Sequence, residues 1–167
     1  MNGSQCTLCS ACVFSWLAGY RWVRGRWGEV PANAVAGGED KGETLYVGRA
    51  VHQDNLLPGK VHPSNRRCYV SYRNVEESYG EYEVLVCEGA KLAWQPCLDN
   101  AIPATAIPGG KTSYGETLYI GRAFHAGTLT CGKVHPSQKC LYIPYRGEEH
   151  WYSTYEILIC RTDEGCT

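Results

Sequence analysis

The hexapeptide GKVHPS occurs twice in this chain, at residues 59–64 and 132–137. Shifting the chain against itself by 73 positions extends the match to residues 42–87 and 115–160, where 25 of 46 positions are identical. Four of the remaining positions exchange Val for Ile. Self-similarity of this length indicates one supersecondary unit used twice. Because no Ser/Gly-rich or charged linker separates the copies, we expect them to share one core.

The match continues upstream with a shift of 72, where VPANAVAGG at 30–38 aligns with IPATAIPGG at 102–110. One residue is therefore inserted shortly after the second Gly-Gly pair. The predicted organisation is a Cys-rich N-terminal segment (1–18), a first repeat (19–89), a second repeat (90–161) and a C-terminal tail (162–167).

The residue pattern predicts an all-β fold. With 19 Gly and 12 Tyr but only 2 Phe and 1 Met, the composition favours short strands joined by tight turns. Apolar residues alternate along ETLYVGRAV (43–51), which is the period of a strand, and no segment has the period of an amphipathic helix. The Pro-Gly pair in LPGK (57–60) predicts a turn, which would leave Lys60 exposed, so that its removal would not disturb the fold.

Charge and hydropathy limit the possible partners. A formal net charge of -1 offers no basic surface for nucleic acid or an acidic membrane. No stretch approaches the ~18 apolar residues of a membrane span. The short apolar run near the N-terminus has no positively charged region before it, so we do not expect a cleaved signal. The expected location is the cytoplasm, or release without a signal peptide.

The chain has ten cysteines, three of them in CTLCSAC (Cys6, Cys9 and Cys12). A structural zinc site needs four ligands, and Cys166 is the obvious distant candidate for the fourth. Zinc binding, cross-linking between chains and lipid attachment all remain open for this segment. We expect no cofactor, and the spacing of the histidines does not indicate a metal site.

Comparison of the two copies leads to two further predictions, one on arginines and one on tryptophans. Arg49 and Arg122 fall on the apolar face of predicted strands, which requires a nearby acid. Glu83 and Glu156 are the expected partners, in structural ion pairs. Trp22 and Trp94 occupy matching positions in the two copies, and we expect them in the core. Trp27 and Trp151 have no tryptophan counterpart, and we expect them at an exposed or interfacial position.

From about residue 19 onward, both copies follow the order W…VPxNAVxGG…GxxLYVGRAxH…LxPGKVHPS…CYVxY…E…YEVL. This order resembles the DM9 repeat. The resemblance implies an all-β fold of two intertwined, pseudo-symmetric repeats that forms a homodimer. It also implies a mannose-binding lectin that acts in innate immunity as a pattern-recognition protein toward microbial glycans, without enzyme activity.

In the lectins of this family the sugar is held by an acid before the GxxLYVGRA strand and by the PGK lysine. The lysine corresponds to Lys60 and, in the second copy, to Lys133. The acid corresponds to Asp40 if the distance from Gly-Gly decides, or to Glu39 if the distance to the strand decides. The second copy reads GGKTSYGE without an acid, so we expect the two copies to differ and the first to be the stronger site.

A carboxylate can accept hydrogen bonds from adjacent sugar hydroxyls, and an ammonium can donate to sugar oxygens. The alternative function is a non-catalytic intracellular adaptor or structural module with weak or no sugar binding. A glycosidase would need a defined pair of acids, and the spacing of the glutamates singles out no such pair.

Overall fold

The computed structural model describes residues 19–161, and the segments with Cys6, Cys9, Cys12 and Cys166 lie outside the described residues. The described chain forms one sheet of 14 strands with a single 3-10 turn, Pro136–Gln138, which confirms the all-β prediction. No described helix has the length and apolar character needed to cross a membrane.

The strands of the first repeat are β1 (Tyr20–Arg26), β2 (Ala36–Asp40), β3 (Glu43–His52), β4 (Asn55–His62), β5 (Arg67–Tyr72), β6 (Val75–Tyr79) and β7 (Glu81–Cys87). Those of the second are β8 (Lys91–Cys97), β9 (Pro108–Lys111), β10 (Thr117–His125), β11 (Thr128–His135), β12 (Cys140–Tyr145), β13 (Glu148–Tyr152) and β14 (Tyr155–Arg161).

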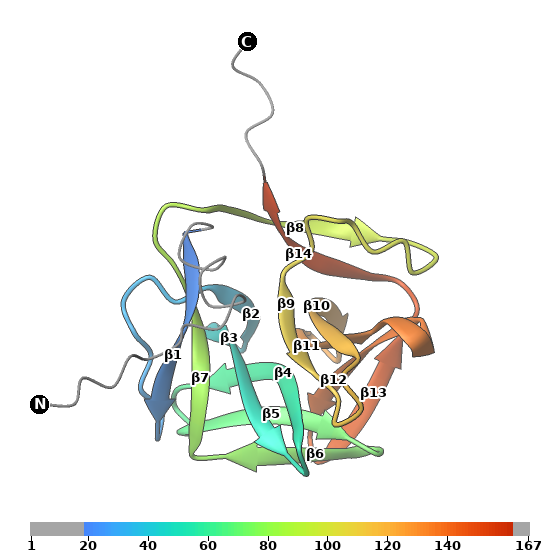
Figure 1. Ribbon diagram of the computed structural model, residues 1–167. Coiled ribbons are helices and arrows are strands. Elements are labelled where there is room, and N and C mark those ends of the chain that lie inside the picture. Colours follow the sequence, from blue (N-terminus) through green and yellow to red (C-terminus); the bar gives the residue numbers. More distant parts are fainter. Residues whose placement is uncertain (1–18, 162–167) are drawn as a thin grey trace, which may run out of the picture.

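The strand order shows that the two repeats are intertwined. It runs β1-β7-β3-β2-β11-β12-β13-β6-β5-β4-β9-β10-β14-β8, so strands of one repeat continue the sheet of the other. Repeats meet at three junctions, where β2 pairs with β11, β13 with β6, and β4 with β9. The order reads the same from both ends once each strand is replaced by its counterpart, which is a pseudo-two-fold arrangement. The strands of both repeats lie together in one body (Figure 1).

The buried side chains confirm a shared core. One cluster combines both repeats: Val47, Leu85, Ile107, Ile120, Cys131 and Leu158. Trp22 and Trp94 are partly buried and pack against this cluster, as expected for the matched pair. Because these apolar residues are removed from water only when the repeats come together, neither repeat can form this part of the core alone.

The predicted ion pairs are present, each within its own repeat. Arg49 lies 3.0 Å from Glu83, and Arg122 lies 2.7 Å from Glu156. Each guanidinium also stacks on a tryptophan, at 4.1 Å from the ring centre of Trp22 for Arg49 and at the equivalent position on Trp94 for Arg122. These contacts are partly buried, so they combine charge pairing with apolar packing.

The predicted turn at LPGK is wrong, because these four residues lie inside β4. The chain reverses instead at Gln53 and Asp54, which both have the positive φ of a left-handed turn. Pro58 is tolerated in the strand because β9 pairs with β4 only at Leu56 and β5 begins to pair at Lys60. The missing N–H of Pro58 therefore removes no outer ladder bond.

Gly59 and Gly132 have no room for a side chain. A Cβ on either would lie 2.0 Å from a carbonyl oxygen of the next strand, that of Tyr69 or Tyr142. The glycine of GKVHPS is thus required by the close approach of two backbones in each repeat.

We predict that Gly59→Ala destabilises the protein by about 1–3 kcal/mol or more, because the backbone of β5 must move to accept the methyl group. Urea unfolding followed by circular dichroism measures the change. Gly127→Ala is the control, since a Cβ there meets nothing within 4 Å and only the φ of +81° opposes it. A smaller effect for Gly59→Ala than for the control would contradict the close approach.

Candidate functional site

Lys60 is buried, which corrects the expectation of an exposed turn lysine. Lys60 is only 6% exposed, and its Nζ donates a 2.5 Å hydrogen bond to the backbone carbonyl of Pro144 in the other repeat. The Glu76 carboxylate lies 3.9 Å away, and the rings of Tyr69 and Tyr145 lie within 6 Å of the ammonium. The lysine therefore has a structural role in joining the repeats, whatever else it binds.

Lys133 occupies the mirrored position in the second repeat. Its Nζ donates to the carbonyl of Ser71 at 2.5 Å and lies 3.0 Å from Glu149. Burial lowers the pKa of both lysines, and the facing glutamate in each site opposes that shift. Sequence analysis missed these two glutamates, although their identity in both copies was the available signal.

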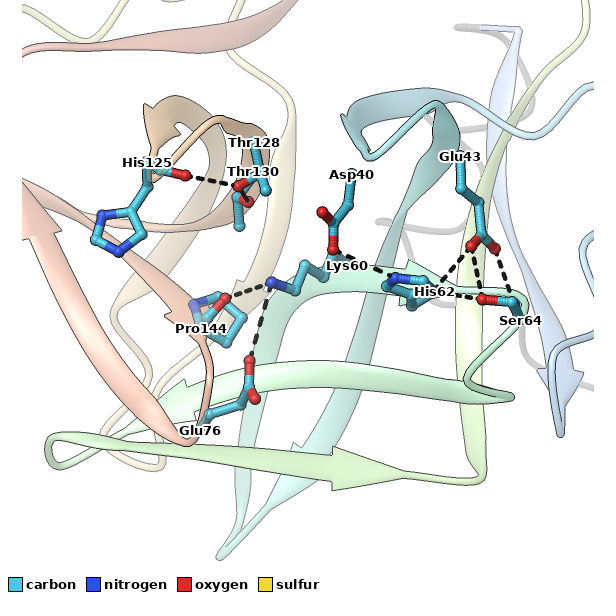
Figure 2. A network of polar contacts seen from close by, with 10 residues as sticks. All are labelled: Asp40, Glu43, Lys60, His62, Ser64, Glu76, His125, Thr128, Thr130 and Pro144. Atoms are coloured by element: carbon cyan, nitrogen blue, oxygen red, sulfur yellow. Dashed lines mark hydrogen bonds and ion pairs between the residues drawn. The ribbon is translucent and has the colours of Figure 1, made fainter.

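The end of the hexapeptide forms a polar network with the start of the β3 strand. The Glu43 carboxylate accepts hydrogen bonds from the backbone N–H of Ser64 at 2.8 Å and from its hydroxyl at 2.6 Å. The Ser64 hydroxyl bond is the main reason that the pKa of Glu43 is lowered. His62 Nδ1 lies 3.2 Å from the same hydroxyl, as Figure 2 shows. The second repeat has the same network with Glu116, Ser137 and His135.

The structure separates the two candidate acids. Asp40, at the end of β2, is directed toward the side chains of Lys60 and His62 (Figure 2), with its Oδ2 3.6 Å from His62 Nε2. Its charge is among the causes that raise the pKa of Lys60 against the effect of burial. Glu39 is exposed and lies opposite Leu129 where β2 meets β11. Asp40 and Lys60 are thus brought together, and Glu39 is not part of this group.

The second repeat contributes to the surroundings of Asp40 and Lys60. Thr128 lies on β11 beside the group, with its hydroxyl 2.8 Å from the Thr130 hydroxyl and donating to the His125 carbonyl (Figure 2). Lys60 is close enough to His125 to lower the pKa of that histidine, after burial and His150. Hydroxyl and imidazole groups of the second repeat therefore lie on the same side of the junction as the carboxylate and ammonium groups of the first (Figure 2).

The corresponding place in the second repeat differs in its chemistry. Lys133 lines a cavity of about 530 Å³ together with Asn55, Tyr72, Ser113, Tyr142 and Glu149. The residue that aligns with Asp40 is Thr112, so the additional carboxylate is missing. The loop with the inserted residue instead places Tyr114 at the rim, 98% exposed. The expected difference between the two copies is therefore seen in the residues around the two lysines.

These features define a tandem-repeat β protein whose two halves build two related polar sites at their junctions. The chain belongs to the DM9 repeat family, whose model matches residues 8–79 and 39–152.

Known relatives include Natterin-3 of Thalassophryne nattereri, 29% identical over 140 residues, which are 81% of this chain and 35% of that protein. Natterin-1 of the same fish is 28% identical over 142 residues, 81% of this chain and 37% of that protein. The chain thus spans about a third of the length of these relatives. Among solved structures, the crystal structure of the nematode sperm cell motility protein MFP2B superposes on this chain with a TM-score of 0.68 and 16% sequence identity. The match covers 100% of this chain and 55% of the MFP2B chain, and it shows that the two share a fold.

We predict that Lys60→Met destabilises the protein by about 1–3 kcal/mol, because the Pro144 carbonyl and the Glu76 carboxylate lose their buried partner. Urea unfolding measures this change. Lys111→Met, at an exposed position of β9, should stay within about 0.5 kcal/mol of the wild type. Equal stability of the two variants would show that the contact between the repeats contributes nothing.

Proposed function

We propose that this protein is a non-catalytic lectin that binds mannose-containing glycans on microbial surfaces as a pattern-recognition protein. The observation that carries the proposal is the convergence of Asp40 on β2 and Lys60 on β4, two strands that flank β3, with Glu39 outside this group. Membership of the DM9 repeat family supports the same function. The proposal takes no activity from the natterins or MFP2B, because this chain spans only part of their length.

The chemistry of the group suits a sugar. Lys60 uses one N–H on the Pro144 carbonyl, which leaves further donors for a ring or hydroxyl oxygen. The Asp40 carboxylate can accept from two adjacent hydroxyls, and such charge-assisted hydrogen bonds are the stronger kind. Because strands β2 and β4 fix both side chains, little conformational entropy is lost on binding.

The first repeat is proposed as the stronger mannose site. In the second, Lys133 lies closer to its own glutamate, at 3.0 Å against 3.9 Å for Lys60. No carboxylate corresponds to Asp40 there, so a sugar at Lys133 would lack the paired acceptor. We therefore propose that Lys133 contributes a weaker or differently selective site.

We predict that Asp40→Asn weakens mannose binding at least tenfold, since losing a charge-assisted hydrogen bond costs about 1.5–3 kcal/mol. Isothermal titration calorimetry with mannose measures the affinity. Glu39→Gln is the matched control and should leave it unchanged, because Glu39 is exposed and away from Lys60. If Glu39→Gln is the more damaging change, the assignment of the acid is wrong. No binding by the well-folded wild type would favour an adaptor or structural module instead.

We predict a homodimer, because one shallow sugar site binds weakly and two equal sites gain by avidity on a glycan surface. A two-fold dimer would supply two copies of the Asp40–Lys60 site. Trp151, 67% exposed on β13, offers apolar surface for the contact. Light scattering in reducing buffer should give about twice the chain mass of 18.5 kDa. A monomer at micromolar concentration that still agglutinates mannan-bearing cells would contradict the prediction.

A further inference from the structure

A cavity of about 790 Å³ lies on the first repeat, beside the edge strand β1. Its rim is formed by Arg24, Arg26, Trp27, Glu29, Tyr79 and Glu81, and it reaches the tip of the β3–β4 hairpin at Val51 and Leu56. It shares no lining residue with the cavity at Lys133, and neither Asp40 nor Lys60 belongs to it. It is therefore a separate feature of the molecule, which we call the Trp27 cleft.

The second repeat shows which parts of this region the fold requires. The stacked unit of Trp22, Arg49 and Glu83 recurs as Trp94, Arg122 and Glu156, so it belongs to the common frame. Apart from Tyr79, which aligns with Tyr152, the rim does not recur. Arg24, Arg26, Trp27, Glu29 and Glu81 align with Pro96, Leu98, Asp99, Ala101 and Thr154. A smaller cavity of about 450 Å³ lies at Leu98, Asp99 and Thr154. The polar and aromatic rim is thus an addition to the first copy that the fold can do without.

Trp27 occupies a position that does not favour a large aromatic residue. Its φ is 50°, in the left-handed region, and its counterpart Asp99 has a φ of 51° and is of a type that tolerates this conformation. The ring is nonetheless fixed: a Cβ on Gly80 would lie 2.4 Å from it, and the Arg67 guanidinium stacks at 4.8 Å. It remains 47% exposed. A half-exposed aromatic ring that its neighbours hold in place can contact a ligand outside the chain at little entropic cost.

The charges of the cleft balance. Arg24, Arg26 and Arg49 line it together with Glu29, Glu81 and Glu83. The strand register places Arg24 opposite Glu83 and Arg26 opposite Glu81. Within residues 19–161, however, no ion pair involves Arg24 or Glu81. An anion would meet three carboxylates here and a cation three guanidinium groups, so a net charge on the ligand would bring no advantage.

A ligand for this cleft must both donate and accept hydrogen bonds, carry no net charge and present an apolar face to aromatic rings. Sugar hydroxyls donate and accept, and a pyranose ring has such a face. The volume lies within the range of small-molecule sites, about 300–1,000 Å³. We propose that the Trp27 cleft is a second carbohydrate site, which binds a neutral oligosaccharide independently of Asp40 and Lys60.

The test uses the whole chain and an array of neutral di- to tetrasaccharides, with uronate- and sulfate-bearing glycans alongside. The central variant is Trp27→Asp, which installs the residue of the second repeat and suits the positive φ. Its matched control is Phe124→Val, which replaces another exposed aromatic residue with its counterpart from the first repeat. Arg24→Gln and Glu81→Gln each remove one charge, the second without a change of side-chain size, and test the polar rim. Calorimetry with the soluble form of a bound oligosaccharide then gives affinities without avidity.

We expect at least one neutral oligosaccharide to lose tenfold or more in affinity with Trp27→Asp and threefold or more with each Gln variant. Phe124→Val and Asp40→Asn should leave that affinity unchanged, whereas Asp40→Asn alone should weaken mannose. The proposal is overturned if no neutral oligosaccharide depends on Trp27, if only acidic glycans do, or if every Trp27-dependent glycan is lost equally with Asp40→Asn. Failure here leaves the mannose site untouched, because that site is read out by mannose calorimetry.

Discussion

Two buried lysines that reach across the repeat boundary are the interaction on which the rest of this structure depends. Lys60 donates to the carbonyl of Pro144, and Lys133 donates to that of Ser71. Each ammonium also faces a glutamate of its own repeat, but only the other repeat supplies the carbonyl that accepts its short hydrogen bond, and a buried donor left unsatisfied is destabilising. The same requirement puts a positive charge at each junction, where strands from both copies bring acids and hydroxyls. The junctions are therefore at once the points of assembly and the candidate binding sites.

Five of the six residues of GKVHPS have a role in this arrangement. The glycine permits the approach of the next strand, the lysine joins the repeats, and Val61 is fully buried in the core. His62 and Ser64 fix the following turn through Glu43. Because these five residues meet several different physical demands, few substitutions are compatible with all of them. This explains the identity of the hexapeptide in two copies that have diverged elsewhere, without requiring both to bind the same ligand.

The sequence predicted features that depend on local pattern or on pairing within one repeat. These include the strand period, the Arg49–Glu83 and Arg122–Glu156 pairs, and the exposure of Trp27 and Trp151. It misplaced the turn at LPGK because a Pro-Gly pair usually ends a strand, and only the gap between β9 and β5 makes Pro58 acceptable. Burial of Lys60 was equally hidden, because its partner is a backbone carbonyl 84 residues away. A backbone carbonyl leaves no signature in the sequence, so no pattern of residue types could identify it.

Pseudo-symmetry also separates what the fold needs from what it permits. Positions that carry the frame are the same in both copies, namely the stacked Trp–Arg–Glu units and the lysine–glutamate pairs. Positions at the rims differ: Asp40 aligns with Thr112, and Trp27 with Asp99. The two copies have the same fold although they carry different residues at these rim positions. These positions can therefore change without loss of the fold. An intertwined duplication thus keeps both halves bound to one geometry while their surfaces diverge. One short chain can in this way present several recognition surfaces that are not equivalent, which neither an unpaired repeat nor a strictly symmetric pair could provide.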